Sequence, residues 1–200
     1  MAIVLLLDQI ESRTGEDRVG SVSEALNARY AERLVLPFAR TIGDEMQGVL
    51  RAESLGDVVR EVLKDGQWWI GVGIGPVEDP LPSDTREARG PAFWNAREAI
   101  GKAKNRRRAR PLAVVSTDQT GDRLEQCLSG LAYVINRRTP SQRRAAFEYE
   151  TSDGNVNETA VRLGMSVQGA RKNVLAAGSE EEEDLASLAG WIAGLASDLD

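Results

Sequence analysis

The feature that most restricts the fold is a run of apolar residues at the start of the chain, "AIVLLLD". Residues 2–7 are all apolar, without polar alternation, which is typical of a strand buried on both faces of a sheet. The run ends at Asp8, so a carboxylate lies at the end of this strand. Such a strand needs neighbours on both edges and a covering layer on both faces.

Later patterns supply these neighbours. Strands are expected at "RLVLPFAR", "MQGVLR", "QWWIGVGIGPV" and "PLAVVSTD", and helices at about residues 16–30, 54–66 and 91–103. Pro37 predicts an edge or a bulge in its strand. The order of strands and helices predicts an α+β fold, close to a ferredoxin-like sheet layered with helices, in residues 1–120.

Glycine and aromatic residues in this region have structural interpretations. Gly71, Gly73 and Gly75 are spaced by two on a strand, which indicates close backbone packing rather than a phosphate loop. Four aromatic residues favour core positions over base stacking, namely Trp68, Trp69, Phe93 and Trp94.

Composition restricts the chemistry. The 200 residues include no His and one Cys, which argues against a disulfide, a zinc site and His-dependent nucleophiles. Chemistry must therefore depend on carboxylates, basic groups or a hard cation. No apolar run is long enough to cross a membrane, so we expect a cytoplasmic protein without a membrane partner.

The hairpin "ARTIGDEMQGVL" raises the possibility of a cation site. Gly43, Asp44 and Glu45 form an acidic turn between two apolar segments. If the strands are adjacent, Asp8 and Asp44 meet at one sheet edge, where two carboxylates suit Mg²⁺. An acidic turn that only reverses the chain remains an equal alternative.

Residues 121–200 are expected to be helical, with a helix-turn-helix at about residues 141–177. The segment "NVNETAVRLGMSVQGARKNVLAAG" contains two short helices around a Gly164 turn, with Ser166 capping the second. We expect DNA to be contacted by Ser166, Gln168, Arg171, Lys172, Asn173, Arg143 and Arg144. An amphipathic helix, "LASLAGWIAGLASDL", follows. A homodimer interface is expected either on this helix or on the helix at residues 122–138, and the last helix can alternatively cover the core. The run "SEEEED" before it is expected to be a solvated helix start.

Charge is distributed unevenly. Residues 101–144 contain eleven Lys or Arg and three acids, whereas residues from 178 onward contain seven acids and no Lys or Arg. A polyanion is therefore attracted to the middle of the chain despite a net charge of -6. The run "KAKNRRRAR" suits either nucleic-acid contact or a solvated loop.

Several of these segments resemble known families. "LLLDQIESRT", "ARTIGDEMQGVL", "WWIGVGIGPV" and "GPAFWNAREAI" resemble, in this order, the four signature regions of class III nucleotide cyclases. The combination of "GDEMQG", "GVGIG" and "GPAFWNAREAI" is similar to the SatD family of small bacterial proteins, across essentially the whole chain. The segment "TPSQRRAAFEYET" resembles the supporting helix of region-4-like sigma factor domains.

The cyclase resemblance implies metal- and nucleotide-binding residues, but two positions of the cyclase helix motif are not matched. It implies metal binding by Asp8 and Asp44, and nucleotide binding by Arg40, Gly43, Glu45, Asn95 and Arg97. Counting from Gly90, however, Trp94 occupies the cyclase Asn position and Glu98 its Arg position. Because one residue is about 100° on a helix, Asn95 and Arg97 are displaced from these roles. The resemblance thus implies a cyclase-like domain that binds a metal or nucleotide without turnover, and no catalytic residue is assigned.

We therefore expect a homodimeric DNA-binding transcriptional regulator with a metal- or nucleotide-sensing domain. One alternative is a Mg²⁺-dependent nucleotidyl- or phosphoryl-transfer enzyme, and another is a protein-interaction module. The sequence identifies neither the ligand nor the DNA target.

Overall fold

The computed structural model describes residues 1–12, 15–106 and 110–197. Its first part contains β1 (Ala2–Gln9), α1 (Val19–Tyr30), β2 (Leu34–Arg40), β3 (Glu45–Leu50), α2 (Leu55–Asp65), β4 (Trp68–Gly75), α3 (Pro91–Lys104) and β5 (Leu112–Ser116). Its second part contains α4 (Thr120–Asn136), α5 (Pro140–Thr151), α6 (Val156–Leu163), α7 (Val167–Ala177) and α8 (Ser179–Ser197). Among the described helices, none is long and apolar enough to cross a membrane.

The sheet confirms the expected α+β class. Its strand order is β2-β3-β1-β4-β5, and all pairs are antiparallel except β4 with β5. Strands β1 to β4 therefore follow the order of a ferredoxin-like βαββαβ unit. Strand β2 lies at an edge, and its pairing with β3 is irregular on both sides of Leu36. This edge position and the irregular pairing confirm the interpretation of Pro37.

Strand β1 is buried on both faces, as its continuous apolar run predicts. Ile3, Leu5 and Leu7 belong to a core that α1, α2, α4 and α8 complete. Val4 and Leu6 lie on the opposite face, where α3 and the loop before it cover the sheet. The main core thus crosses the expected domain division near residue 120, and that division stays a prediction.

Glycines in β4 allow α3 to lie directly on the sheet. A Cβ at Gly73 would lie 2.2 Å from the Ala92 carbonyl oxygen and 2.2 Å from the Ala96 nitrogen. At Gly71 it would lie 2.6 Å from the Ile100 nitrogen. These contacts confirm that the alternating glycines serve backbone packing.

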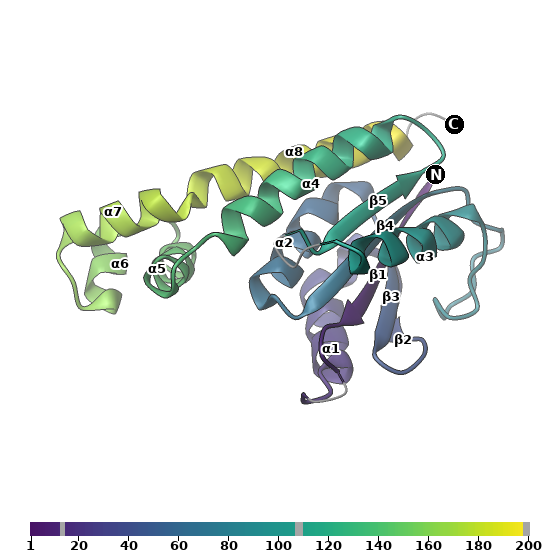
Figure 1. The fold of residues 1–200 in the computed structure, drawn as a ribbon, viewed down its shortest axis with the longest axis horizontal. Helices are drawn as coiled ribbons and strands as arrows, with labels where there is room; N and C mark the ends of the chain where they lie inside the picture. The colour runs from purple at the N-terminus through teal and green to yellow at the C-terminus, as the bar shows by residue number, and fades with distance from the viewer. Residues whose placement is uncertain (13–14, 107–109, 198–200) are drawn as a thin grey trace.

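Helix α8 returns to the first part of the chain and runs beside α4 (Figure 1). Its buried stripe consists of small residues, namely Ala186, Ala189, Ala193 and Ala196. At Gly56 of α2, an added Cβ would lie 1.8 Å from the Ala186 carbonyl oxygen, so larger side chains do not fit. Leu188, Trp191 and Leu195 are consequently exposed.

The expectation that "SEEEED" is a solvated start was wrong for Glu182. Helix α8 begins at Ser179, and Glu182 lies inside the protein with a 6% exposed side chain. Its carboxylate pairs with Arg138 at 2.5 Å and with Lys64 at 2.9 Å. Glu182 thereby joins the end of α4 to α2, which the local charge pattern did not predict.

Helices α5, α6 and α7 form a three-helix module (residues 140–177) at one end of the molecule, away from the sheet (Figure 1). We call the part that includes β1 to β5 with α1, α2 and α3 the α+β lobe (residues 1–116). Helices α4 and α8 connect the two. Thr139 and Gln142 form a capping box at the start of α5, which fixes where the module begins.

Candidate functional site

The register of the sheet brings the predicted carboxylates together at one end. Asp8 of β1 lies opposite Glu45 of β3, and the Gln9 backbone nitrogen donates to the Asp44 carbonyl at 3.1 Å. Glu45 is therefore the direct neighbour of Asp8, while Asp44 precedes the paired strand. We call Asp8, Asp44 and Glu45 the acidic end of the sheet.

Asp8 is largely buried, and a cation holds it. Its side chain is 7% exposed, and Lys104 Nζ donates to Asp8 Oδ2 at 2.5 Å. Burial raises the pKa of Asp8 above its ordinary value, and Asp44 and Glu45 add to this effect. Lys104 opposes the increase in pKa without reversing it.

Helix α3 provides both cations of the acidic end. Arg97 forms an ion pair with Glu45, and Lys104 Nζ lies 3.8 Å from the other Glu45 oxygen. Sequence reasoning did not assign Lys104 to the site. Its only signal was its place in a basic run, because the contact with Asp8 spans most of the α+β lobe in sequence.

The acidic end does not fit a magnesium site as it is arranged. The Asp8 carboxylate holds an ammonium group, and Ser12 Oγ donates to the Asp44 carboxylate. Among the described residues, no group of three or more His, Cys, Asp or Glu side chains is placed to hold a metal ion. The metal role of Asp8 and Asp44 stays a prediction.

The remaining residues of the predicted nucleotide site are only partly brought together. Arg40 pairs with Asp17 at 2.7 Å and donates to the Gly43 carbonyl at 2.6 Å, so it stabilises the hairpin. Asn95 Nδ2 donates to the Ile74 carbonyl at 2.7 Å and anchors α3 to β4. Within the predicted set, the described contacts join Arg40 to Gly43 and Arg97 to Glu45, as two separate pairs.

The helix positions that distinguish this chain from the cyclases point outward. Trp94 is 67% exposed, which overturns its expected core position, whereas Trp68 is buried as predicted. Glu98 pairs with Lys102 at 2.8 Å on the exposed side of α3. On α3, the face toward the sheet is taken by alanines, and the large Trp94 ring does not fit there.

In the three-helix module, the second and third helices meet through a short turn. Helix α6 ends at Gly164, which has φ +65°, and three residues separate α6 from α7. Ser166 Oγ accepts the Gly169 backbone N–H at 3.2 Å and so caps α7. Buried Ala160 and Ala170 lie where the helices pack. Helix-turn-helix proteins use connections of this length.

The predicted DNA-contacting side chains differ in their surroundings. Gln168, Arg171 and Lys172 are exposed on α7, and Arg144 is exposed on α5. Asn173 is half-buried, and its Nδ2 donates to the Gly169 carbonyl at 3.0 Å within the same helix. Arg143 also is exposed and lines a cleft toward the α+β lobe. Of the seven predicted contacts, Asn173 is thus engaged within its own helix and Arg143 faces the cleft.

Some apolar side chains of the module are exposed. Val161 is 80% exposed, and Val167 and Leu175 also lie at the surface. The helices are short and approach largely through small residues, among them the buried Ala145, Ala160, Ala170 and Ala177.

Comparisons with known proteins identify a family. The model of the SatD family matches residues 4–155, which extend from β1 to the residue before α6. The similarity expected across essentially the whole chain is thus shown for this part only. Searches of curated proteins and of solved structures each return no match.

Proposed function

The chain belongs to the SatD family, and from this premise we propose that it is a DNA-binding transcriptional regulator. In this proposal α7 enters the major groove of DNA. The α+β lobe senses a ligand without converting it, and the two parts communicate through α4 and α8.

The exposed face of α7 is the observation that carries the proposal. Gln168, Arg171 and Lys172 all project from this helix into solvent, and α7 contains no acidic residue. Arg and Lys suit phosphates and guanine, and Gln suits adenine. The face therefore has the chemistry that reading a major groove requires.

The cations of α7 are also free to bind a polyanion. Among the described residues, neither Arg171 nor Lys172 forms an ion pair, whereas Arg162 of α6 pairs with Glu158 at 2.8 Å. A cation without a carboxylate partner can neutralise a phosphate without first losing an internal contact. The helix can thus approach DNA at little electrostatic cost.

The working form that we propose is a homodimer. One copy of α7 offers two cations, which supports only modest affinity, and two half-sites raise it. Leu188, Trp191 and Leu195 lie on the exposed face of α8 at spacings of three and four residues. Their spacing suits an interface with the same helix of a second copy.

The sensing role of the α+β lobe is supported by the ion pairs that two charged positions of α3 already form. Arg97 is paired with Glu45, and the position expected to hold a charge-stabilising Arg is Glu98, which pairs with Lys102. A Mg²⁺ ion or a nucleotide at the acidic end remains part of the proposal. Its binding there requires Lys104 to leave Asp8.

A protein-interaction module is the second candidate, favoured by the exposed Val161, Val167 and Leu175. These apolar side chains lie on the same module as the cations and suit a protein partner as well as a groove. An enzyme is the third. Product formation from a nucleoside triphosphate with Mg²⁺, lost in Asp44→Ala, would favour it.

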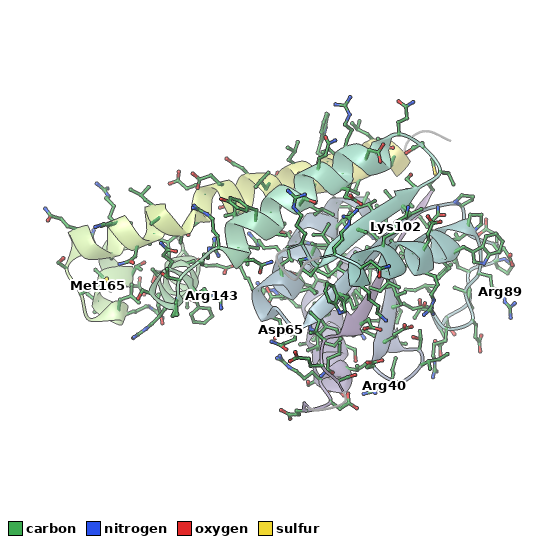
Figure 2. The ribbon with its side chains drawn as sticks, in the orientation of Figure 1. Arg40, Asp65, Arg89, Lys102, Arg143 and Met165 are labelled. Carbon is green, nitrogen blue, oxygen red and sulfur yellow. The ribbon has the colours of Figure 1, made fainter. Side chains whose placement is uncertain are left out.

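The experiment is capture of fragmented bacterial genomic DNA by the purified protein at low and at moderate salt. Wild type is compared with Arg171→Ala/Lys172→Ala. The matched control is Arg89→Ala/Lys102→Ala, which removes two exposed cations from the α+β lobe (Figure 2).

We expect wild type and the control to enrich the same fragments, and the α7 variant to enrich none. Equal loss in both variants would mean that DNA is held by general charge. Absence of retention by wild type would refute the proposal and favour the protein-interaction module.

A further inference from the structure

A cleft of about 680 Å³ separates the α+β lobe from the three-helix module. One wall is the end of α2 and its connection to β4, and the other is the end of α4 with one side of α5. Figure 2 shows Arg143 on α5 and Asp65 across from it on the α+β lobe. The volume lies within the range of pockets that bind small molecules.

Two aromatic rings line the cleft from different helices. Tyr133 of α4 is 66% exposed and Phe147 of α5 is 64% exposed, so neither ring is part of the core. Exposed rings are few in this chain, since it contains only 5% aromatic residues. Rings from two helices on one wall of the cleft provide faces for stacking a planar group.

The cleft also has positive charges that pair with no carboxylate among the described residues, although Arg137 Nη2 donates to the Ala176 carbonyl at 3.4 Å. Its acids are already paired, because Asp65 lies 2.6 Å from Arg18 and Glu150 lies 2.8 Å from Lys64. Arg137 and Arg143 also line the cleft, and among the described residues neither pairs with a carboxylate.

The position of Arg137 connects these two features. Its guanidinium lies 5.9 Å from the centre of the Tyr133 ring. A guanidinium beside an exposed ring can bind an anion while the ring binds a planar group attached to it.

We propose that this cleft binds a ligand that combines a planar aromatic ring with an anionic group. Tyr133 and Phe147 contact the ring, and Arg137 and Arg143 bind the anion. A nucleoside phosphate and a small aromatic carboxylate share this chemistry. Since the ligand contacts residues of both α4 and α5, its binding fixes α5 relative to α4.

This site differs from the acidic end of the sheet, where the available side chains are mainly carboxylates. It also does not depend on DNA binding, because the ligand contacts the inner side of α5 rather than α7. Its test therefore uses the full chain without DNA.

The experiment is isothermal titration of wild type with adenosine monophosphate and, separately, with 4-hydroxybenzoate. Adenosine and inorganic phosphate are titrated to test the ring and the anion alone. The matched variants are Arg143→Ala and Arg144→Ala, which remove adjacent exposed cations of α5, only one of which lines the cleft. Phe147→Ala tests the ring contact, and thermal melts verify that each variant is folded.

We expect at least one of the two aromatic anions to bind more tightly than adenosine or phosphate. Arg143→Ala should weaken its binding tenfold or more, Phe147→Ala severalfold, and Arg144→Ala less than twofold. Binding of adenosine monophosphate alone identifies a nucleotide site, and binding of 4-hydroxybenzoate alone identifies a site for small aromatic acids. The proposal is overturned if neither binds, if phosphate binds equally well, or if Arg143→Ala and Arg144→Ala have the same effect.

Discussion

The charged side chains at the acidic end of the sheet are paired with one another, whereas, among the described residues, those on the exposed face of α7 in the three-helix module are not. At the acidic end, Asp8 is paired with Lys104 and Glu45 with Arg97. On the module, Arg171 and Lys172 project into solvent beside exposed apolar side chains. A site whose charges are satisfied internally must lose contacts before it binds a ligand, whereas the module does not. The comparison therefore directs the search for macromolecular partners to α7.

The strongest test of the comparison concerns the buried ion pairs that join α2 of the α+β lobe to the connecting helices α4 and α8. Arg138 and Glu182 form a pair with side chains that are 3% and 6% exposed, and Lys64 joins them from α2. Removing one partner of a buried ion pair leaves an uncompensated charge. We expect Glu182→Gln to lower the free energy of unfolding by about 3 kcal/mol, measured by urea denaturation.

Glu181→Gln is the matched control, because Glu181 is an exposed neighbour in the same acidic run. Its effect should stay within about 0.5 kcal/mol. Equal effects of the two substitutions would mean that the junction is not held by Glu182. The module would then be joined to the α+β lobe through helix packing and the Lys64–Glu150 ion pair.

The second test concerns the close contact that positions α3 and its cations. A Cβ at Gly73 meets backbone atoms of Ala92 and Ala96, so α3 must move away from the sheet. Gly73→Ala should lower the free energy of unfolding by about 2–3 kcal/mol. Gly101 lies in α3, and a Cβ added there would have no atom within 4 Å. Gly101→Ala should therefore raise the free energy of unfolding by about 0.5–1 kcal/mol.

Circular dichroism during urea denaturation measures both glycine variants. Equal destabilisation by both would contradict close packing at Gly73. Unchanged DNA capture by Gly73→Ala, alongside its lower stability, would sharpen the contrast between a structural α+β lobe and a binding module.

Much of the fold could be predicted because its signals are local. The apolar run before Asp8 predicted a strand buried on both faces, and Gly71 and Gly73 predicted close backbone approach. Gly164 predicted where α6 ends, and Ser166 predicted where α7 begins. In each case the evidence lies within a few residues of the feature that it predicts.

What the sequence did not predict depends on contacts between distant elements. In the sequence Glu182 is indistinguishable from the acidic residues beside it, and only the packing of α8 places it next to Arg138 and Lys64. Trp94 appeared to be a core residue, but it lies on the side of α3 that faces away from the sheet, where its ring is exposed. Lys104 was one cation of a basic run, and only the tertiary fold brings it to Asp8.

The smallest expected effect is electrostatic and lies at the acidic end. Burial raises the pKa of Asp8, so the folded protein binds this proton more tightly than the unfolded chain does. Its contribution to the free energy of unfolding therefore falls as pH rises from the ordinary value of 3.8 through the raised folded pKa. Asp8→Asn removes this dependence, so its stability relative to wild type should increase across the same range and then level off.

Lys104→Ala tests the same pair from the other side. Without the ammonium group the pKa of Asp8 rises further, and the free energy of unfolding at pH 7 should fall by about 1 kcal/mol. This loss should disappear at low pH, where Asp8 is protonated and has no charge for Lys104 to pair with. Lys102→Ala, which affects only the pair with Glu98 on the exposed side of α3, is the control. A loss that is independent of pH, or equal in both variants, would show that Lys104 acts through packing, and the acidic end would then have a free carboxylate available for a cation.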